Sequence, residues 1–181
     1  MMSAEPNNVE VNIAKHLAAI DLCLSNHLRM PALVLIYSGI DILASLARPP
    51  ANPDTSRSDF INWCNSYLVP SGFNECSPIE LYSARCAVIH TYSSESSLSR
   101  KGVARAVIYA WGDHPPKPLQ DVIDFVGLKA IVVIHIDGLA HALREAGSFF
   151  FTKINEDPEL RQLVTARGLT FFQDHCDVLD P

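Results

Sequence analysis

The sequence lacks the cysteine spacing of a zinc or redox site. Its cysteines are odd in number and scattered along the 181 residues, with no close Cys-x-x-Cys pair. They are Cys23, Cys64, Cys76, Cys86 and Cys176. This pattern disfavours both a disulfide framework and a structural zinc site. We therefore expect free thiols in a reducing compartment and no bound metal.

Long apolar runs are also missing. The longest, such as 32–37 and 130–134, are far shorter than the roughly 20 residues that a membrane-spanning helix needs. The first residues, Met-Met-Ser-Ala-Glu-Pro-Asn-Asn, have neither the basic start nor the apolar core of a secretion signal. These absences predict a soluble, cytoplasmic protein with no membrane partner.

Basic residues and glycines are few. The chain has 14 Lys and Arg against 20 Asp and Glu, a formal charge of −6, which argues against a general nucleic-acid coat. Its 8 glycines are scattered and form no phosphate-binding loop, so we expect no cofactor. A local basic patch is still compatible with this composition.

The residues that are present predict a helical domain. Hydrophobic residues make up 48% of the chain and recur at helical spacing through most of it. Flanking prolines and capping residues mark several helix ends, including Ser77, Pro78 and Glu80 before one helix and Asp157 before another. The helices are predicted at 9–27, 32–47, 59–68, from 78 past His90, at 118–147 and at 158–168.

One stretch departs from the helical pattern. Residues 103–111 are rich in β-branched and aromatic side chains and predict a strand or extended arm within a polar insertion at 94–117. Residues 130–136 alone resemble a buried strand, but their periodic flanks favour a helix. The predicted fold is all-α, a helical bundle with a small extended or β appendage around 103–111. It forms one domain over 1–181, with disorder expected at 1–8 and 174–181.

The most polar part of an otherwise apolar helix carries Arg85 and His90. They lie five residues apart, about 140° around an ideal helix, so they share a face only if the helix frays or tightens near His90. A guanidinium binds phosphate, and an imidazole transfers protons near neutral pH. These are the two groups that a metal-free ribonuclease needs, one to stabilise the charged transition state and one for acid–base catalysis.

Arg85-Cys-Ala-Val-Ile-His90, at the end of a helix and preceded by the apolar helix at 37–46, resembles the motif of the HEPN superfamily. The resemblance covers about residues 9–150 in helix order. It implies a homodimer in which two such motifs meet in one cleft, and a metal-independent RNase of toxin–antitoxin, defence or RNA-processing systems. Cys86 stands where active members often have a polar residue. Other members bind nucleotides or have lost activity.

The hypothesis therefore assigns catalysis to Arg85 and His90, with six supporting ligand-binding residues. Those are Tyr37, Asp41, Ser94, Glu95, Arg100 and Lys101. Four cations and one anion between Arg85 and Arg105 give this segment a charge of +3, which favours RNA or a small anion. Two alternatives stay open: a structural role for Arg85, for example bonded to Asp41, and a non-catalytic nucleotide-binding or protein-interaction module with a protein partner.

Overall fold

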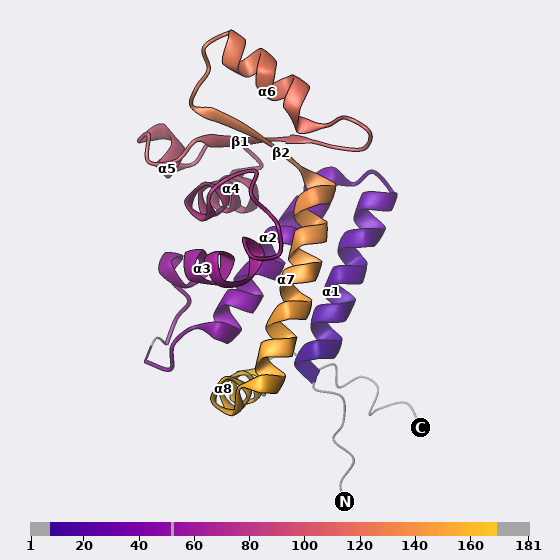
Figure 1. The fold of residues 1–181 in the computed structure, drawn as a ribbon, viewed down its shortest axis with the longest axis vertical. Coiled ribbons are helices and arrows are strands. Elements are labelled where there is room, and N and C mark those ends of the chain that lie inside the picture. The colour runs from indigo at the N-terminus through magenta and orange to yellow at the C-terminus, as the bar shows by residue number, and fades with distance from the viewer. Residues whose placement is uncertain (1–7, 52, 170–181) are drawn as a thin grey trace, which may run out of the picture.

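The computed structural model describes residues 8–51 and 53–169 and is mostly helical. Helices α1 (Asn8–Ser25), α2 (Arg29–Ala47) and α7 (Ile136–Glu156) pack side by side, and α8 (Pro158–Gly168) crosses one end of them (Figure 1). Asp157 caps α8 as predicted, because its Oδ1 accepts hydrogen bonds from the N–H groups of Glu159 and Leu160. The disorder predicted for 1–8 and 174–181 concerns residues outside the described ranges, apart from Asn8, where α1 begins.

Helix α2 is the centre of the core. Leu33, Ile36, Ile40 and Leu43 are all at most 2% exposed. Among the described helices, α2 alone is long and apolar enough to cross a membrane, yet half of its apolar window is buried inside the fold. A core helix has this same combination of length, composition and burial.

Close packing around α2 requires a glycine. A Cβ atom on Gly39 would lie 3.1 Å from Leu143 Cδ2 on α7 and 3.2 Å from His16 Nε2 on α1. Both distances are shorter than ordinary van der Waals contacts. The hydrogen at this position therefore lets the three long helices approach one another closely.

Two further helices cover the side of α2. Helix α3 (Arg57–Trp63) continues into a π-helical turn, η1 (Cys64–Leu68), and α4 (Pro78–Thr91) packs beside it. The helix predicted at 59–68 is confirmed and begins two residues earlier, because Ser56 is its cap. The Ser56 N–H donates to Asp59 Oδ2 at 2.8 Å, and Ser56 Oγ accepts from the Asp59 N–H.

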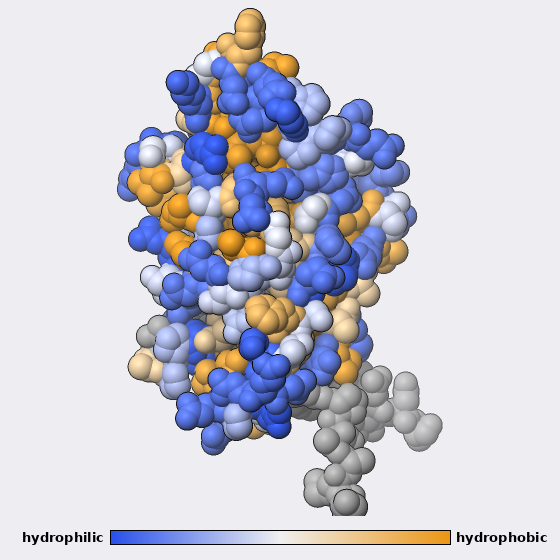
Figure 2. Space-filling view, in the orientation of Figure 1, coloured by the Kyte–Doolittle hydropathy of each residue, from blue (hydrophilic) through white to orange (hydrophobic). Residues whose placement is uncertain are grey.

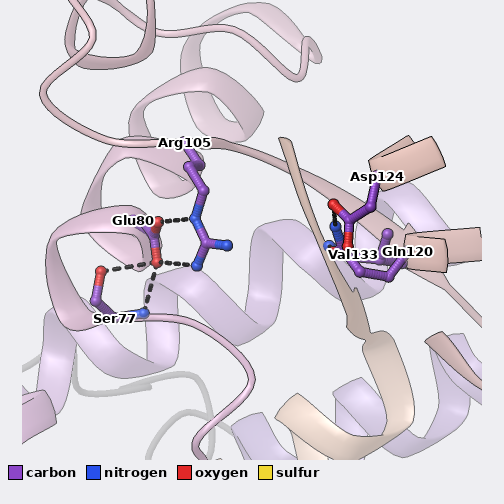
Figure 3. Close-up of polar contacts among 6 residues, drawn as sticks. All are labelled: Ser77, Glu80, Arg105, Gln120, Asp124 and Val133. Atoms are coloured by element: carbon purple, nitrogen blue, oxygen red, sulfur yellow. Dashed lines mark hydrogen bonds and ion pairs between the residues drawn. The ribbon is translucent and has the colours of Figure 1, made fainter. Parts of the chain in front are cut away.

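The first turn of α4 holds the appendage in place. Glu80 Oε2 accepts from the Ser77 N–H at 2.7 Å and from the Ser77 hydroxyl at 2.8 Å, as the capping signal predicts. Arg105, just before the first strand, donates to the same carboxylate through Nε at 2.5 Å and Nη2 at 3.3 Å (Figure 3). One buried carboxylate thus joins a helix start to a strand start.

The appendage is a strand–helix–strand unit. Strand β1 (Ala106–Ala110) confirms the extended segment predicted at 103–111, and a single helical turn, α5 (Ser97–Arg100), precedes it. Helix α6 (Pro116–Phe125) crosses over to β2 (Ile131–His135), which pairs with β1 in parallel.

The single helix predicted over 118–147 is therefore wrong. Gly127, with φ of +79°, ends the helical path after α6, and the β-branched residues that follow pair with β1. Val132, Val133 and Ile134 are all at most 4% exposed. The pairing of β2 with β1, which lies 25 residues earlier in the sequence, outweighs the helical periodicity of the flanking residues.

The small sheet lies across one end of the bundle with α6 on its outer side (Figure 1). Val107, Val132 and Ile134 join the main core, whereas Ala110 and Val133 pack with Ile123 of α6 in a second small cluster. Apolar side chains also reach the surface at this end of the molecule (Figure 2). The exposed large ones on and after α6 are Leu119, Val122, Phe125, Val126 and Leu128.

Candidate functional site

The structure joins Arg85 and Asp41 directly. Arg85 on α4 donates through Nε to Asp41 Oδ2 on α2 at 2.7 Å. Their side chains are 24% and 25% exposed, so the pair is half-buried between the helices and is partly open to solvent. This is the arrangement that the structural alternative for Arg85 predicted.

The pair lines a cavity of about 370 Å³. Hydroxyl-bearing side chains make up most of the remaining wall; the lining residues are Asp41, Ile42, Ser45, Thr55, Ser56, Tyr82 and Arg85. Asp41 occupies only the Nε edge of the guanidinium. Among the described residues, the terminal amino groups of Arg85 have no closer hydrogen-bond partner than Cys86 Sγ, 4.0 Å from Nη1. The cavity therefore combines a cation with several neutral hydrogen-bonding groups.

The charges of the pair are set by opposing effects. Burial raises the pKa of Asp41, and the hydrogen bond and charge of Arg85 offset this rise only in part. For Arg85, burial acts to lower the pKa but the contact with Asp41 outweighs it, so the pKa lies above its usual value. The guanidinium stays charged, and burial opposes the charged form of Asp41 more strongly than Arg85 offsets it.

Tyr82 contributes a neutral phenol to the cavity. Burial raises its pKa, and its contact with Cys86 adds to the rise. The phenol therefore remains protonated at neutral pH and is able to donate a hydrogen bond into the cavity.

His90 lies outside the cavity wall. It is exposed near the end of α4, one residue before Thr91. Tyr92 ends the helix with φ of +50°, a left-handed conformation. The charge of His90 nevertheless lowers the pKa of Asp41, which puts the imidazole within electrostatic range of the pair. Arg85 and His90 are thus neighbours, but only Arg85 lines the cavity.

Most of the supporting residues lie elsewhere. Tyr37 is 0% exposed and its hydroxyl shares a 2.8 Å hydrogen bond with the Tyr109 hydroxyl, so it belongs to the core between α2 and β1. Burial raises the pKa of both phenols. Ser94 lines a different cavity, beside β1. Glu95, Arg100 and Lys101 are exposed and do not line the cavity beside Arg85; these three positions are on the 94–101 segment.

The serine run is fixed to α4 rather than directed at Arg85. Ser96 and Ser83 are both buried, and their hydroxyls share a 2.6 Å hydrogen bond. Ser96 Oγ also accepts from the N–H groups of Leu98 and Ser99 and so caps α5. The hydroxyl groups of this run therefore form hydrogen bonds with one another and with nearby backbone N–H groups.

The hydroxyls that surround Arg85 were not predicted from the sequence. Ser45 is four residues after Asp41 on α2, and Tyr82 is three residues before Arg85 on α4, so helical spacing carries a signal for both. Thr55 and Ser56 reach the cavity from the loop before α3, and no sequence period identifies them.

Comparisons with protein-family models, curated proteins and solved structures gave no match. The resemblance to the HEPN superfamily therefore stays a prediction from the motif and the helix order. Within residues 8–51 and 53–169, no group of three or more His, Cys, Asp or Glu side chains is placed to hold a metal ion.

Proposed function

We propose that the cavity beside Arg85 binds a phosphate group of RNA or of a nucleotide. The observation that carries this proposal is the one-sided contact of Arg85, whose Nε bonds Asp41 while its terminal amino groups have no carboxylate partner among the described residues. A guanidinium held along one edge presents its other edge in a fixed orientation, which suits two phosphate oxygens.

The remaining wall supports the same ligand class. Ser45, Thr55 and Tyr82 add hydroxyl groups that donate to phosphate or accept from a ribose. A cavity of about 370 Å³ is within the range of small-molecule sites. Asp41 limits the negative charge that the cavity accepts, which favours one phosphate group over a polyphosphate.

RNA cleavage is the second candidate, and the position of His90 favours it. His90 is exposed on the same helix as Arg85, and it is near enough to Asp41 for its charge to act on that carboxylate. In this scheme Arg85 holds one phosphate and His90 transfers a proton at the neighbouring ribose or leaving oxygen, without a metal. This is the activity that the HEPN resemblance implies, in a homodimer.

The test measures binding and cleavage of a labelled single-stranded RNA in the presence of a chelator. Arg85→Gln is expected to weaken binding about tenfold or more, because it removes a charge-assisted, two-pronged contact. His90→Gln is expected to leave binding nearly unchanged and, if the wild type cleaves, to lower the rate about 100-fold or more.

Lys15→Gln is the matched control, because Lys15 is exposed on α1 and does not line the cavity. It removes one positive charge and should retain wild-type binding. Binding that Arg85→Gln leaves intact, in a variant that is still fully folded at the assay temperature, would refute the phosphate site. Binding without cleavage by the wild type would refute the ribonuclease and leave the binding module.

A further inference from the structure

A second cavity, of about 400 Å³, lies between the start of α2, the end of α4 and strand β1. This volume is within the range of small-molecule sites. The base of the cavity is part of the core, because Leu33, Val88, Val107 and Ile136 are all at most 2% exposed. A ligand would therefore meet the more exposed part of the wall, which includes Arg29, Met30, Tyr92, Ser93, Ser94 and Trp111.

Two large aromatic side chains of this wall are exposed. Tyr92, at the end of α4, is 67% exposed, and Trp111, directly after β1, is 41% exposed. Aromatic side chains of the core, such as Phe60 and Phe150, are fully buried. Exposed aromatic rings beside an apolar cavity provide contact area for a flat apolar group.

Backbone strain coincides with this region. Among the described residues other than glycine, only His27 and Tyr92 have a left-handed backbone, with φ of +57° and +50°. Tyr92 lines the cavity, and His27 lines an adjoining cavity of about 390 Å³ that shares Arg29, Trp111 and Ile136 with it. Glycine is the usual residue at such a helix end, because it has no Cβ atom. Strain of this kind concentrates at ligand sites, and here both strained residues lie beside the same pair of cavities.

The cavity has one positive charge that no described residue neutralises. Arg29 is the one Lys or Arg among the described residues that line either cavity. Its guanidinium lies 4.3 Å from the centre of the Trp111 ring and forms no ion pair with a described carboxylate. None of the described residues that line the 400 Å³ cavity carries a carboxylate, and the first turn of α2 has no acidic residue. The charge is therefore available to an anionic ligand.

We propose that this cavity binds a small aromatic carboxylate. The ring of the ligand lies against Tyr92 and Trp111 over the apolar base, and its carboxylate accepts hydrogen bonds from the Arg29 guanidinium. The Ser94 hydroxyl is a further donor at the rim. The site has no lining residue in common with the cavity beside Arg85, and it does not depend on the function proposed there.

A single negative charge suits this site better than the two charges of a phosphate monoester. Arg29 supplies one permanent positive charge, and Asp113 and Asp137 line the adjoining cavity. A flat ring suits the wall better than a flexible chain, because it packs against aromatic side chains and loses less conformational entropy on binding.

The test uses the two tryptophans of the chain as reporters. Trp111 lines the cavity, whereas Trp63 is 2% exposed in the core, so the indole N–H signals in an NMR spectrum of the full-length protein report on the site and on an internal control. The probes are cinnamate and cinnamamide, which share a shape and differ in charge. Cinnamate is expected to shift the signals of the Trp111 indole and the Tyr92 amide with a Kd below about 1 mM, and to leave Trp63 unchanged.

Arg29→Gln tests the charge of the site, with Lys15→Gln as the exposed control of equal charge change. The wild type and Lys15→Gln should bind cinnamate about tenfold more tightly than cinnamamide, because the amide loses a charge-assisted contact. Arg29→Gln should bind the two probes equally. Cinnamate that leaves the Trp111 signal in place, equal binding of both probes by the wild type, or a preference for cinnamate that survives Arg29→Gln would overturn the proposal.

Discussion

Arg85 and Asp41 differ in how costly it is to leave each side chain unpaired when its partner is substituted. Arg85 has a long, flexible side chain that can reach solvent when unpaired. Asp41 is short and fixed on α2, and burial raises its pKa even in the presence of Arg85. Loss of the cation therefore leaves a buried carboxylate without compensation, whereas loss of the anion leaves a cation that water can solvate.

We accordingly predict unequal effects of two substitutions on the free energy of unfolding. Arg85→Met should destabilise the protein by about 1–2 kcal/mol, and Asp41→Asn by less than about 0.5 kcal/mol, after allowance for partial solvent exposure. Urea unfolding at neutral pH measures both. The double variant should be more stable than Arg85→Met, because it leaves no unpaired charge between the helices. Equal losses of stability in the two single variants would contradict this picture.

The sequence alone identified the Arg85–Asp41 ion pair as an alternative to a catalytic role for Arg85. It did not identify the residues that surround the pair. Helical spacing places Arg85 on an apolar helix and makes Asp41 a costly buried charge that needs a partner. The cation that completes it is the one Lys or Arg residue of α4. The hydroxyls of Thr55 and Ser56 come from a loop whose path depends on how α3 packs, so no local pattern locates them.

At the scale of the element, the first turn of α4 has the opposite pH dependence from the Asp41 site. Burial acts to raise the pKa of Glu80, but hydrogen bonds from Arg105 and Ser77 outweigh it, and the pKa lies below its usual value of 4.5. A carboxyl group with a lowered pKa stabilises the fold above its unfolded-state pKa. That contribution is lost as the pH falls through the folded-state value.

Glu80→Gln should therefore lower the free energy of unfolding at neutral pH by about 1–2 kcal/mol, because Glu80 is buried and its ion pair with Arg105 depends on its charge. The difference from the wild type should shrink as the pH falls below the usual pKa. Urea midpoints across this pH range provide the measurement. A difference that stays constant down to acid pH would show that the charge of Glu80 does not matter.

Most long elements with local signals were predicted, whereas β2, whose pairing partner is distant in the sequence, was missed. Caps at Ser77 and Asp157 and the apolar period of α1 and α2 depend on residues within a few positions of one another. Strand β2 is different, since its partner β1 lies 25 residues earlier and a helix intervenes. The 130–136 segment has the composition of a buried strand, and only the pairing decides against the helix.

At the scale of the whole molecule, side chains from outside the sheet cap the outer edge of β2. Gln120 accepts from the Val133 N–H at 2.8 Å (Figure 3), and Glu75 accepts from the His135 N–H at 2.6 Å. Gln120 and Glu75 come from α6 and from the loop before α4, so two separate segments act together on β2. Exposed strand edges promote self-association. The two side chains therefore limit the number of sites at which this chain can pair with another.

The variant Gln120→Ala with Glu75→Ala should open the β2 edge and cause concentration-dependent association. Light scattering after size-exclusion chromatography measures it, and the apparent mass should rise with protein concentration more steeply than in the wild type. Lys117→Ala is the control, because Lys117 is exposed on the same helix and pairs with Asp121 rather than with β2. A variant that associates no more than the wild type would show that these side chains do not protect the edge.

Strand β2 runs into α7 without a loop: the strand ends at His135 and the helix begins at Ile136. The 21 residues of α7 extend about 32 Å at 1.5 Å per residue, through the bundle to α8. Because no loop separates β2 from α7, a displacement of the strand is passed directly to the helix. A tilt of the sheet at one end of the molecule therefore becomes a swing of the α7 axis, largest at the far end, where α8 is attached.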